Sequence, residues 1–148
     1  MKTKSLLAAA ALLLLAAPPA HAQSLQDQQA SCKAQADKVF EPFNAKWMAS
    51  STRPSLADAP YHTSYYNKDL GVCLVSIITH PEGFKSDQWE VRDAFGGRVF
   101  ASYSWSNFTN RKYWEVPPTT CWTAFTGETK YCKSEDEFSE AVMAYFNK

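Results

Sequence analysis

The sequence predicts an α+β fold: an N-terminal helix, an antiparallel β-meander of about five to six strands and a C-terminal helix. Three observations lead to this fold class. Apolar residues recur at three- and four-residue steps in one segment near each end of the chain. Between these segments, short runs rich in β-branched and aromatic residues alternate with turn sequences. The four cysteines are spread from the N-terminal helical segment to the end of the strand-rich region, so two disulfides are expected to join these parts.

Residues 1–22 have the features of a secretory signal peptide and are excluded from the predicted fold. A short basic start leads into residues 5–17, a run of Leu and Ala, and Ala20-His21-Ala22 fits the small-x-small pattern that signal peptidases cleave. We therefore expect one exported domain at residues 23–148, periplasmic or secreted. Thiols oxidise in such a compartment, which favours disulfides over free cysteines.

Cys32, Cys73, Cys121 and Cys132 allow three disulfide connectivities. Residues 119–125 and 128–131 are predicted to be two strands around a turn at Thr126-Gly127. In that register Cys121 lies directly opposite Cys132, at a separation that a disulfide can span. The register therefore favours a Cys121–Cys132 bridge, which leaves Cys32 to pair with Cys73. A catalytic or metal-binding role is disfavoured because the chain has no Cys-x-x-Cys pair and no histidine cluster near a cysteine.

The N-terminal helix is predicted over residues 24–48, with Ser24 as its N-cap. Cys32, Ala36 and Phe43 belong to its apolar face. Pro42 lacks the backbone N–H that a helix interior needs and crowds the preceding turn, so a kink or break is expected near Glu41. A loop follows over residues 49–60, where Ser and Pro are frequent.

The predicted strands alternate with Gly-, Asn- and Pro-containing turns. Val72–Thr79 is apolar at successive positions, which predicts a central strand buried on both faces. Gly96-Gly97 predicts a two-residue hairpin between the strands on either side of it. The strands expected are residues 62–66, 72–79, 88–95, 98–106, 119–125 and 128–131.

The C-terminal helix is predicted over residues 134–148. Ser134 and Glu137 have the spacing of a capping box, and the acidic residues that follow Ser134 suit the positive end of a helix dipole. Phe138 and Val142 belong to its apolar face. We expect this helix and the N-terminal helix to cover the same face of the meander.

Two motifs in the middle third of the chain support the interpretation that residues 23–148 form one exported domain. They are Tyr66-Asn67-x-x-Leu70-x-x-Cys73 and Asp93-Ala94-Phe95-x-Gly97. In these motifs the chain resembles a group of small exported bacterial proteins with no established activity. The resemblance implies no catalytic residue. Both motifs also have structural explanations, since Asn and Gly favour turns and Cys73 can form a bridge.

Several classes of function are disfavoured by composition and motifs. The formal net charge is +0 at pH 7, and no basic stripe suggests a nucleic-acid ligand. No apolar run beyond the signal reaches the length of about 20 residues that spans a bilayer. A serine or cysteine nucleophile needs a histidine base, and His62 and His80 fall at opposite ends of a predicted hairpin. We therefore expect no enzyme activity, no cofactor and no metal ion.

The leading functional hypothesis is a non-catalytic exported module that binds another envelope or secreted protein, for example as an inhibitor or an immunity-type protein. The candidate binding segment is the long connection after the fourth predicted strand, since long loops often carry function. Its rings and cations are of the types that dominate binding hot spots. The partner-binding candidates are Phe108, Arg111, Lys112, Tyr113 and Trp114.

Two other hypotheses remain open. The first is a small-ligand or glycan binder that uses an aromatic cleft formed by Trp89, Trp105 and Trp114. The second is a small hydrolase built on Glu90, Glu115 and a histidine, since paired carboxylates can cleave glycosides when they face each other. Both differ from the leading hypothesis in requiring a concave site.

Overall fold

The computed structural model describes residues 24–49, 59–80, 85–107, 109 and 111–146. The predicted signal peptide lies outside these residues. The described elements are α1 (Leu25–Met48), β1 (Tyr61–Asn67), β2 (Val72–Thr79), β4 (Ser86–Asp93), β5 (Val99–Ser106), the 3-10 helix η2 (Tyr113–Glu115), β6 (Thr120–Thr123), β7 (Lys130–Tyr131) and α2 (Glu135–Phe146).

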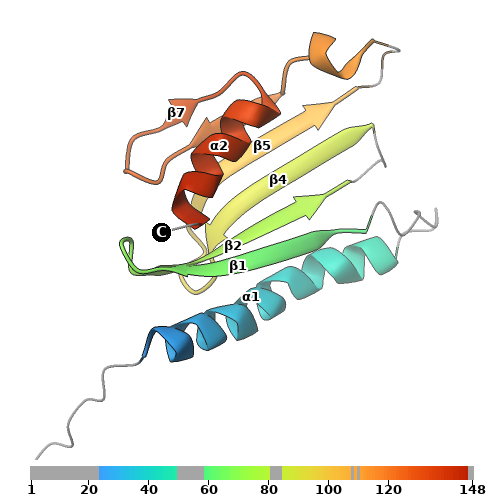
Figure 1. Ribbon diagram of the computed structural model, residues 1–148. Coiled ribbons are helices and arrows are strands. Elements are labelled where there is room, and N and C mark those ends of the chain that lie inside the picture. Colours follow the sequence, from blue (N-terminus) through green and yellow to red (C-terminus); the bar gives the residue numbers. More distant parts are fainter. Residues whose placement is uncertain (1–23, 50–58, 81–84, 108, 110, 147–148) are drawn as a thin grey trace, which may run out of the picture.

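The strands of the described residues form one six-stranded antiparallel sheet in the order β1-β2-β4-β5-β6-β7 (Figure 1). The predicted α+β class with an antiparallel meander is confirmed. Strand β2 is buried on both faces: Cys73, Val75 and Ile77 point to one side, and Leu74 points to the other. Its continuous apolar sequence is explained by this double burial.

The two helices lie on opposite faces of the sheet, so the expectation that both cover one face is wrong. Helix α1 packs against Cys73, Val75 and Ile77 through Cys32 and Ala36. Helix α2 packs against the other face, where Phe138 and Val142 join a core that includes Leu74, Val91 and Tyr103. An apolar run with both faces buried requires cover on both sides, and one helix supplies each cover.

Helix α1 begins at a capping box and contains a proline in its second half. The Ser24 hydroxyl accepts a hydrogen bond from Asp27 N–H at 3.1 Å, and the Asp27 carboxylate accepts one from Ser24 N–H. This capping box satisfies donors that the first turn would leave free. Of the two outcomes expected near Glu41, a kink or a break, the break is absent, since the helix runs through Pro42. Pro42 and Lys38, whose carbonyl loses its helical partner, are both exposed, so water can hydrate that carbonyl.

The connection between β4 and β5 is longer than the predicted two-residue turn at Gly96-Gly97. Strand β4 ends at Asp93, whose side chain accepts a hydrogen bond from Phe95 N–H at 3.0 Å, and Gly97 adopts a φ of 70°. Within the strands, Val91 pairs with Ala101 and Arg92 pairs with Val99. The extra residue of this β-bulge is Phe100, which is buried and stacks on Phe125 at 5.5 Å between ring centroids.

Two disulfides join the elements as predicted. Cys32–Cys73 links α1 to β2, and Cys121–Cys132 links β6 to the residue after β7. The predicted register of the second pair is confirmed, because Trp122 pairs with Tyr131 and Cys132 N–H donates to Cys121 C=O at 3.1 Å. The strands are shorter than predicted, since pairing stops at Thr123 and leaves a wider loop.

The Tyr-Asn-x-x-Leu-x-x-Cys motif has a structural role. Asn67 is fully buried at the end of β1. Its side-chain oxygen accepts a hydrogen bond from Leu70 N–H at 2.9 Å, and its amide nitrogen donates to Tyr145 C=O at 2.7 Å. Asn67 therefore fixes the β1–β2 turn and holds it against the last turn of α2.

Candidate functional site

The predicted binding loop lies beyond β5, at the end of the sheet opposite the β1–β2 and β4–β5 connections (Figure 1). Phe108 and the side chain of Tyr113 are outside the described part. Arg111, Lys112 and Trp114 are exposed, and Trp114 leaves 77% of its surface open to solvent. The loop thus presents a large indole ring to solvent, and packing in the core does not account for a tryptophan at this position.

Hydrogen bonds hold the backbone of this loop at several points. The Asn107 side chain donates to Arg111 C=O at 2.7 Å, and the Arg111 guanidinium donates to Glu115 C=O at 2.6 Å. The Glu115 carboxylate accepts from Lys112 N–H at 3.2 Å. Trp105 Nε1 donates to Val116 C=O at 2.9 Å, which ties the loop to the core of the sheet. The described residues of the loop are therefore held by hydrogen bonds within the chain.

A cation lies over the exposed ring. Lys112 Nζ is 5.3 Å from the centroid of the Trp114 ring. At an exposed site such a contact contributes about 0.5–1 kcal/mol, so it biases the orientation of the indole without removing it from solvent. The ring and the two neighbouring cations, Arg111 and Lys112, form one small patch.

The three tryptophans of the aromatic-cleft hypothesis occupy different environments. Trp89 packs edge-on against Phe138 at 5.1 Å and donates its Nε1 to Ser76 Oγ at 2.6 Å. Trp105 is buried, and its Nε1 donates a hydrogen bond to Val116 C=O. Both rings thus belong to the core beneath α2, whereas Trp114 is exposed.

The residues of the hydrolase hypothesis are also dispersed over different elements. Glu90 forms an ion pair with Arg92 on β4, and Glu115 caps the turn of η2. His62 Nε2 contacts Asp37 Oδ1 at 2.9 Å, and His80 Nδ1 contacts Asp87 Oδ1 at 2.6 Å. Each histidine therefore has an acidic partner, but neither partner is one of the two predicted glutamates.

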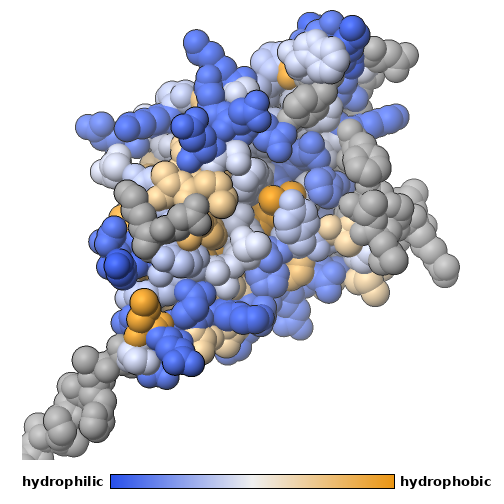
Figure 2. All heavy atoms as spheres, in the orientation of Figure 1, coloured by the Kyte–Doolittle hydropathy of each residue, from blue (hydrophilic) through white to orange (hydrophobic). Residues whose placement is uncertain are grey.

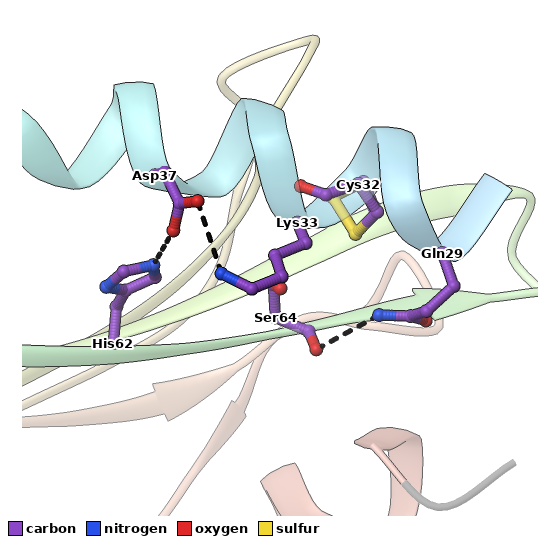
Figure 3. Close-up of polar contacts among 7 residues, drawn as sticks. Gln29, Cys32, Lys33, Asp37, His62 and Ser64 are labelled. Carbon is purple, nitrogen blue, oxygen red and sulfur yellow. Dashed lines mark hydrogen bonds and ion pairs between the residues drawn. A yellow bond between two sulfur atoms is a disulfide. The ribbon is translucent and has the colours of Figure 1, made fainter. Parts of the chain in front are cut away.

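The Asp37–His62 contact joins α1 to β1 (Figure 3). Both residues line a shallow hollow of about 320 Å³. The other Asp37 oxygen contacts Lys33 Nζ at 3.3 Å, and the His62 ring stacks on Phe40 at 4.4 Å. The Lys33 ammonium and the His62 ring hold the pKa of the Asp37 carboxyl below its ordinary value. Within the described ranges, no group of three or more His, Cys, Asp or Glu side chains is arranged to hold a metal ion.

Sequence reasoning missed two rings on the face of the sheet opposite α2, one half-buried and one exposed. Trp122 lies on β6, and Tyr131, on β7, leaves 83% of its surface exposed. The signal that could have found them is the alternation of the cysteine hairpin. Because the Cys121 side chain points into the core, Trp122 must point to the opposite face.

The face of the molecule that carries α2 is mostly hydrophilic, with hydrophobic residues in small separate groups (Figure 2).

No known protein family model, curated protein or solved structure matches the chain. Among the described residues, no helix combines the length and apolar character needed to cross a membrane.

Proposed function

We propose that this chain is an exported, non-catalytic module that binds another envelope or secreted protein, as an inhibitor or immunity-type protein does. Export is supported by the signal-like residues 1–22 and by two disulfides, which form in oxidising compartments. Binding to a protein is supported by an exposed aromatic and basic loop on a rigid scaffold.

The observation that carries the proposal is the combination of exposure and order at Trp114. Trp, Tyr and Arg are the residues that most often supply binding energy at protein interfaces. A loop already held by Asn107 and Trp105 loses little conformational entropy when it docks. Trp114 is therefore suited to insert into an apolar pocket of a partner, with Arg111 and Lys112 facing acidic groups around that pocket.

The test is affinity capture from periplasmic extract, with oxidised protein from residue 23 onward as bait. A Tyr113→Ala/Trp114→Ala variant should lose a stoichiometric partner that the wild type retains. Once the partner is identified, titration should give a loss of affinity of roughly thirtyfold or more, as expected for a hot spot of about 2 kcal/mol.

The matched control is Tyr131→Ala, which removes an equally exposed ring from a different part of the surface. It should bind the partner like the wild type. If the double variant folds and also binds like the wild type, the loop is not the binding site.

A further inference from the structure

The face of the sheet that carries α1 is only half covered by the described elements. Helix α1 packs over β1 and β2, and Glu90 of β4 pairs with Ile77 of β2, which lies beneath the helix. Apart from the contact of Phe43 in α1 with Arg92 of β4, no described helix packs on this face of β4, β5, β6 and β7. The described elements thus leave this half of the sheet face without a covering helix.

The side chains on this surface form two cross-strand rows. Glu90 pairs with Ser102, Ser102 with Trp122, and Trp122 with Tyr131, so this row crosses four strands. The neighbouring row contains Gln88 and Ser104. We call the surface formed by these side chains the platform: Gln88, Glu90, Ser102, Ser104, Trp122 and Tyr131.

The two rings at the outer end of the platform are held in place by a disulfide. Strand β7 is only two residues long, and such a short edge would fray by itself. Cys121 and Cys132 directly flank Trp122 and Tyr131, and their bridge locks the pair of strands that presents both rings. A backbone held by a disulfide beneath one exposed ring, Tyr131, and one half-buried ring, Trp122, is an arrangement that suits a binding site.

We propose that the platform binds an uncharged oligosaccharide. Aromatic rings supply an apolar face with a polar edge, against which the C–H face of a pyranose can stack. Ser102, Ser104 and Gln88 offer hydroxyl and amide groups that both donate and accept hydrogen bonds, as sugar hydroxyls require. The longer row runs from polar groups at Glu90 and Ser102 to the rings of Trp122 and Tyr131, and its length across four strands suits a linear chain of several sugar units.

The charge of the platform favours a neutral ligand. Glu90 is its acidic residue, and Arg92, one position on along this face, neutralises that carboxylate through an ion pair. The Arg92 guanidinium is also held over the Phe43 ring of α1, at 6.0 Å from the centroid. The platform therefore lacks the unpaired cations that nucleic acids and other polyanions need.

The experiment is calorimetric titration of the oxidised protein, from residue 23 onward, with cellohexaose and with chitohexaose as neutral probes. At least one probe should bind at millimolar concentration or below, and Tyr131→Ala should weaken that binding roughly tenfold. Tyr131 is exposed, so this variant is expected to fold like the wild type. Trp122→Ala should weaken binding similarly, with near-UV circular dichroism as its folding check. Trp114→Ala is the matched control and should bind the probe unchanged.

Two results would overturn the proposal. One is that binding persists unchanged in Tyr131→Ala and Trp122→Ala. The other is that neither hexasaccharide binds, and binding of heparin in that case would assign the surface to polyanions. The Trp114→Ala control separates this outcome from failure of the loop as a protein-binding site, because the two surfaces share no residue.

Discussion

The side-chain amide of Gln29 acts on the backbone of Tyr66 as a neighbouring strand would. Gln29 Oε1 accepts a hydrogen bond from Tyr66 N–H at 2.8 Å. Gln29 Nε2 donates to Ser64 C=O at 3.4 Å (Figure 3). Both groups lie on β1, the outer strand of the sheet. An open strand edge is a template for pairing with another chain, and Gln29 occupies part of this edge.

Replacing Gln29 should expose the edge of β1. The Gln29→Ala variant is expected to lose about 1–2 kcal/mol of unfolding free energy, because two backbone groups lose their partner. It should also self-associate as its concentration rises, which analytical ultracentrifugation can measure. Gln26→Ala is the matched control, since Gln26 is exposed on the same helix. Equal stability and a monomeric state for both variants would show that Gln29 does not protect the edge.

Asn67 should be among the most sensitive polar positions in the chain. The Asn67→Ala variant leaves Leu70 N–H and Tyr145 C=O without their partner in a fully buried site, at an expected cost of about 3 kcal/mol. Urea denaturation measures this loss. Asn44→Ala, on the exposed side of α1, serves as the control and should change stability by less than about 0.5 kcal/mol.

Asn67→Asp separates the two hydrogen bonds. Aspartate keeps the acceptor for Leu70 but loses the donor to Tyr145, and it places a carboxylate in a buried site. It should therefore be destabilised at neutral pH at least as much as Asn67→Ala. An Asn67→Asp protein as stable as the wild type would contradict the proposed role of the side chain.

Much of the fold could be predicted from the sequence because local patterns determined it. Val72–Thr79 has the bounds that its apolar run predicts. The alternation of the cysteine hairpin gave the register that places Cys121 beside Cys132. The same run in β2 indicated burial on both faces but not which helix covers each, since that depends on the path of the chain. A kink or a break was expected near Glu41, and the helix continues past Pro42 because packing on β1 and β2 supports it.

The candidate site was harder to predict because a tryptophan can serve a core or a surface. Trp89 alternates with Val91, and Trp105 alternates with Tyr103, which is equally consistent with a core and with a cleft. In the structure both rings pack in the core beneath α2. This is a tertiary contact, which the periodicity of a single strand cannot predict. The exposure of Trp114 depends likewise on where Asn107 and Trp105 hold its loop.

Asp37 should make stability depend on pH in the acidic range. The Lys33 ammonium and the His62 ring lower the pKa of its carboxyl below 3.8 in the folded state. A carboxyl whose pKa is lower in the folded state stabilises the fold when the pH is above its pKa in the unfolded state. This stabilisation is lost as the pH falls through its pKa in the folded state. The stability difference between the wild type and Asp37→Asn should therefore be present at pH 6 and shrink below about pH 4.

Urea denaturation at several pH values between 6 and 2 measures this difference. Glu41→Gln, at an exposed position one helical turn further along α1, is the control for removing a charge. A difference between the wild type and Asp37→Asn that stays constant down to pH 2 would contradict the assigned role of the carboxylate.

The two disulfides should differ in how easily a reductant reaches them. Cys32 and Cys73 are 0% and 1% exposed beneath α1, whereas Cys132 is partly exposed beside a two-residue strand. Mild reduction of the native protein should therefore open Cys121–Cys132 first, and Cys32–Cys73 should open only when the protein unfolds. Alkylation of the new thiols followed by mass spectrometry gives the order.

Loss of the less accessible disulfide, Cys32–Cys73, should cost more unfolding free energy than loss of Cys121–Cys132. The loop-entropy relation gives about 4 kcal/mol for Cys32–Cys73, which closes the longer loop, and about 3 kcal/mol for Cys121–Cys132. A Cys121→Ser/Cys132→Ser variant should stay folded with a frayed β7, whereas Cys32→Ser/Cys73→Ser should detach α1 from β2 and lose more unfolding free energy. Preferential reduction of Cys32–Cys73 in the native protein would show that α1 opens before the C-terminal hairpin does. That result would move the weakest part of the fold from the edge at β7 to the contact between α1 and the sheet.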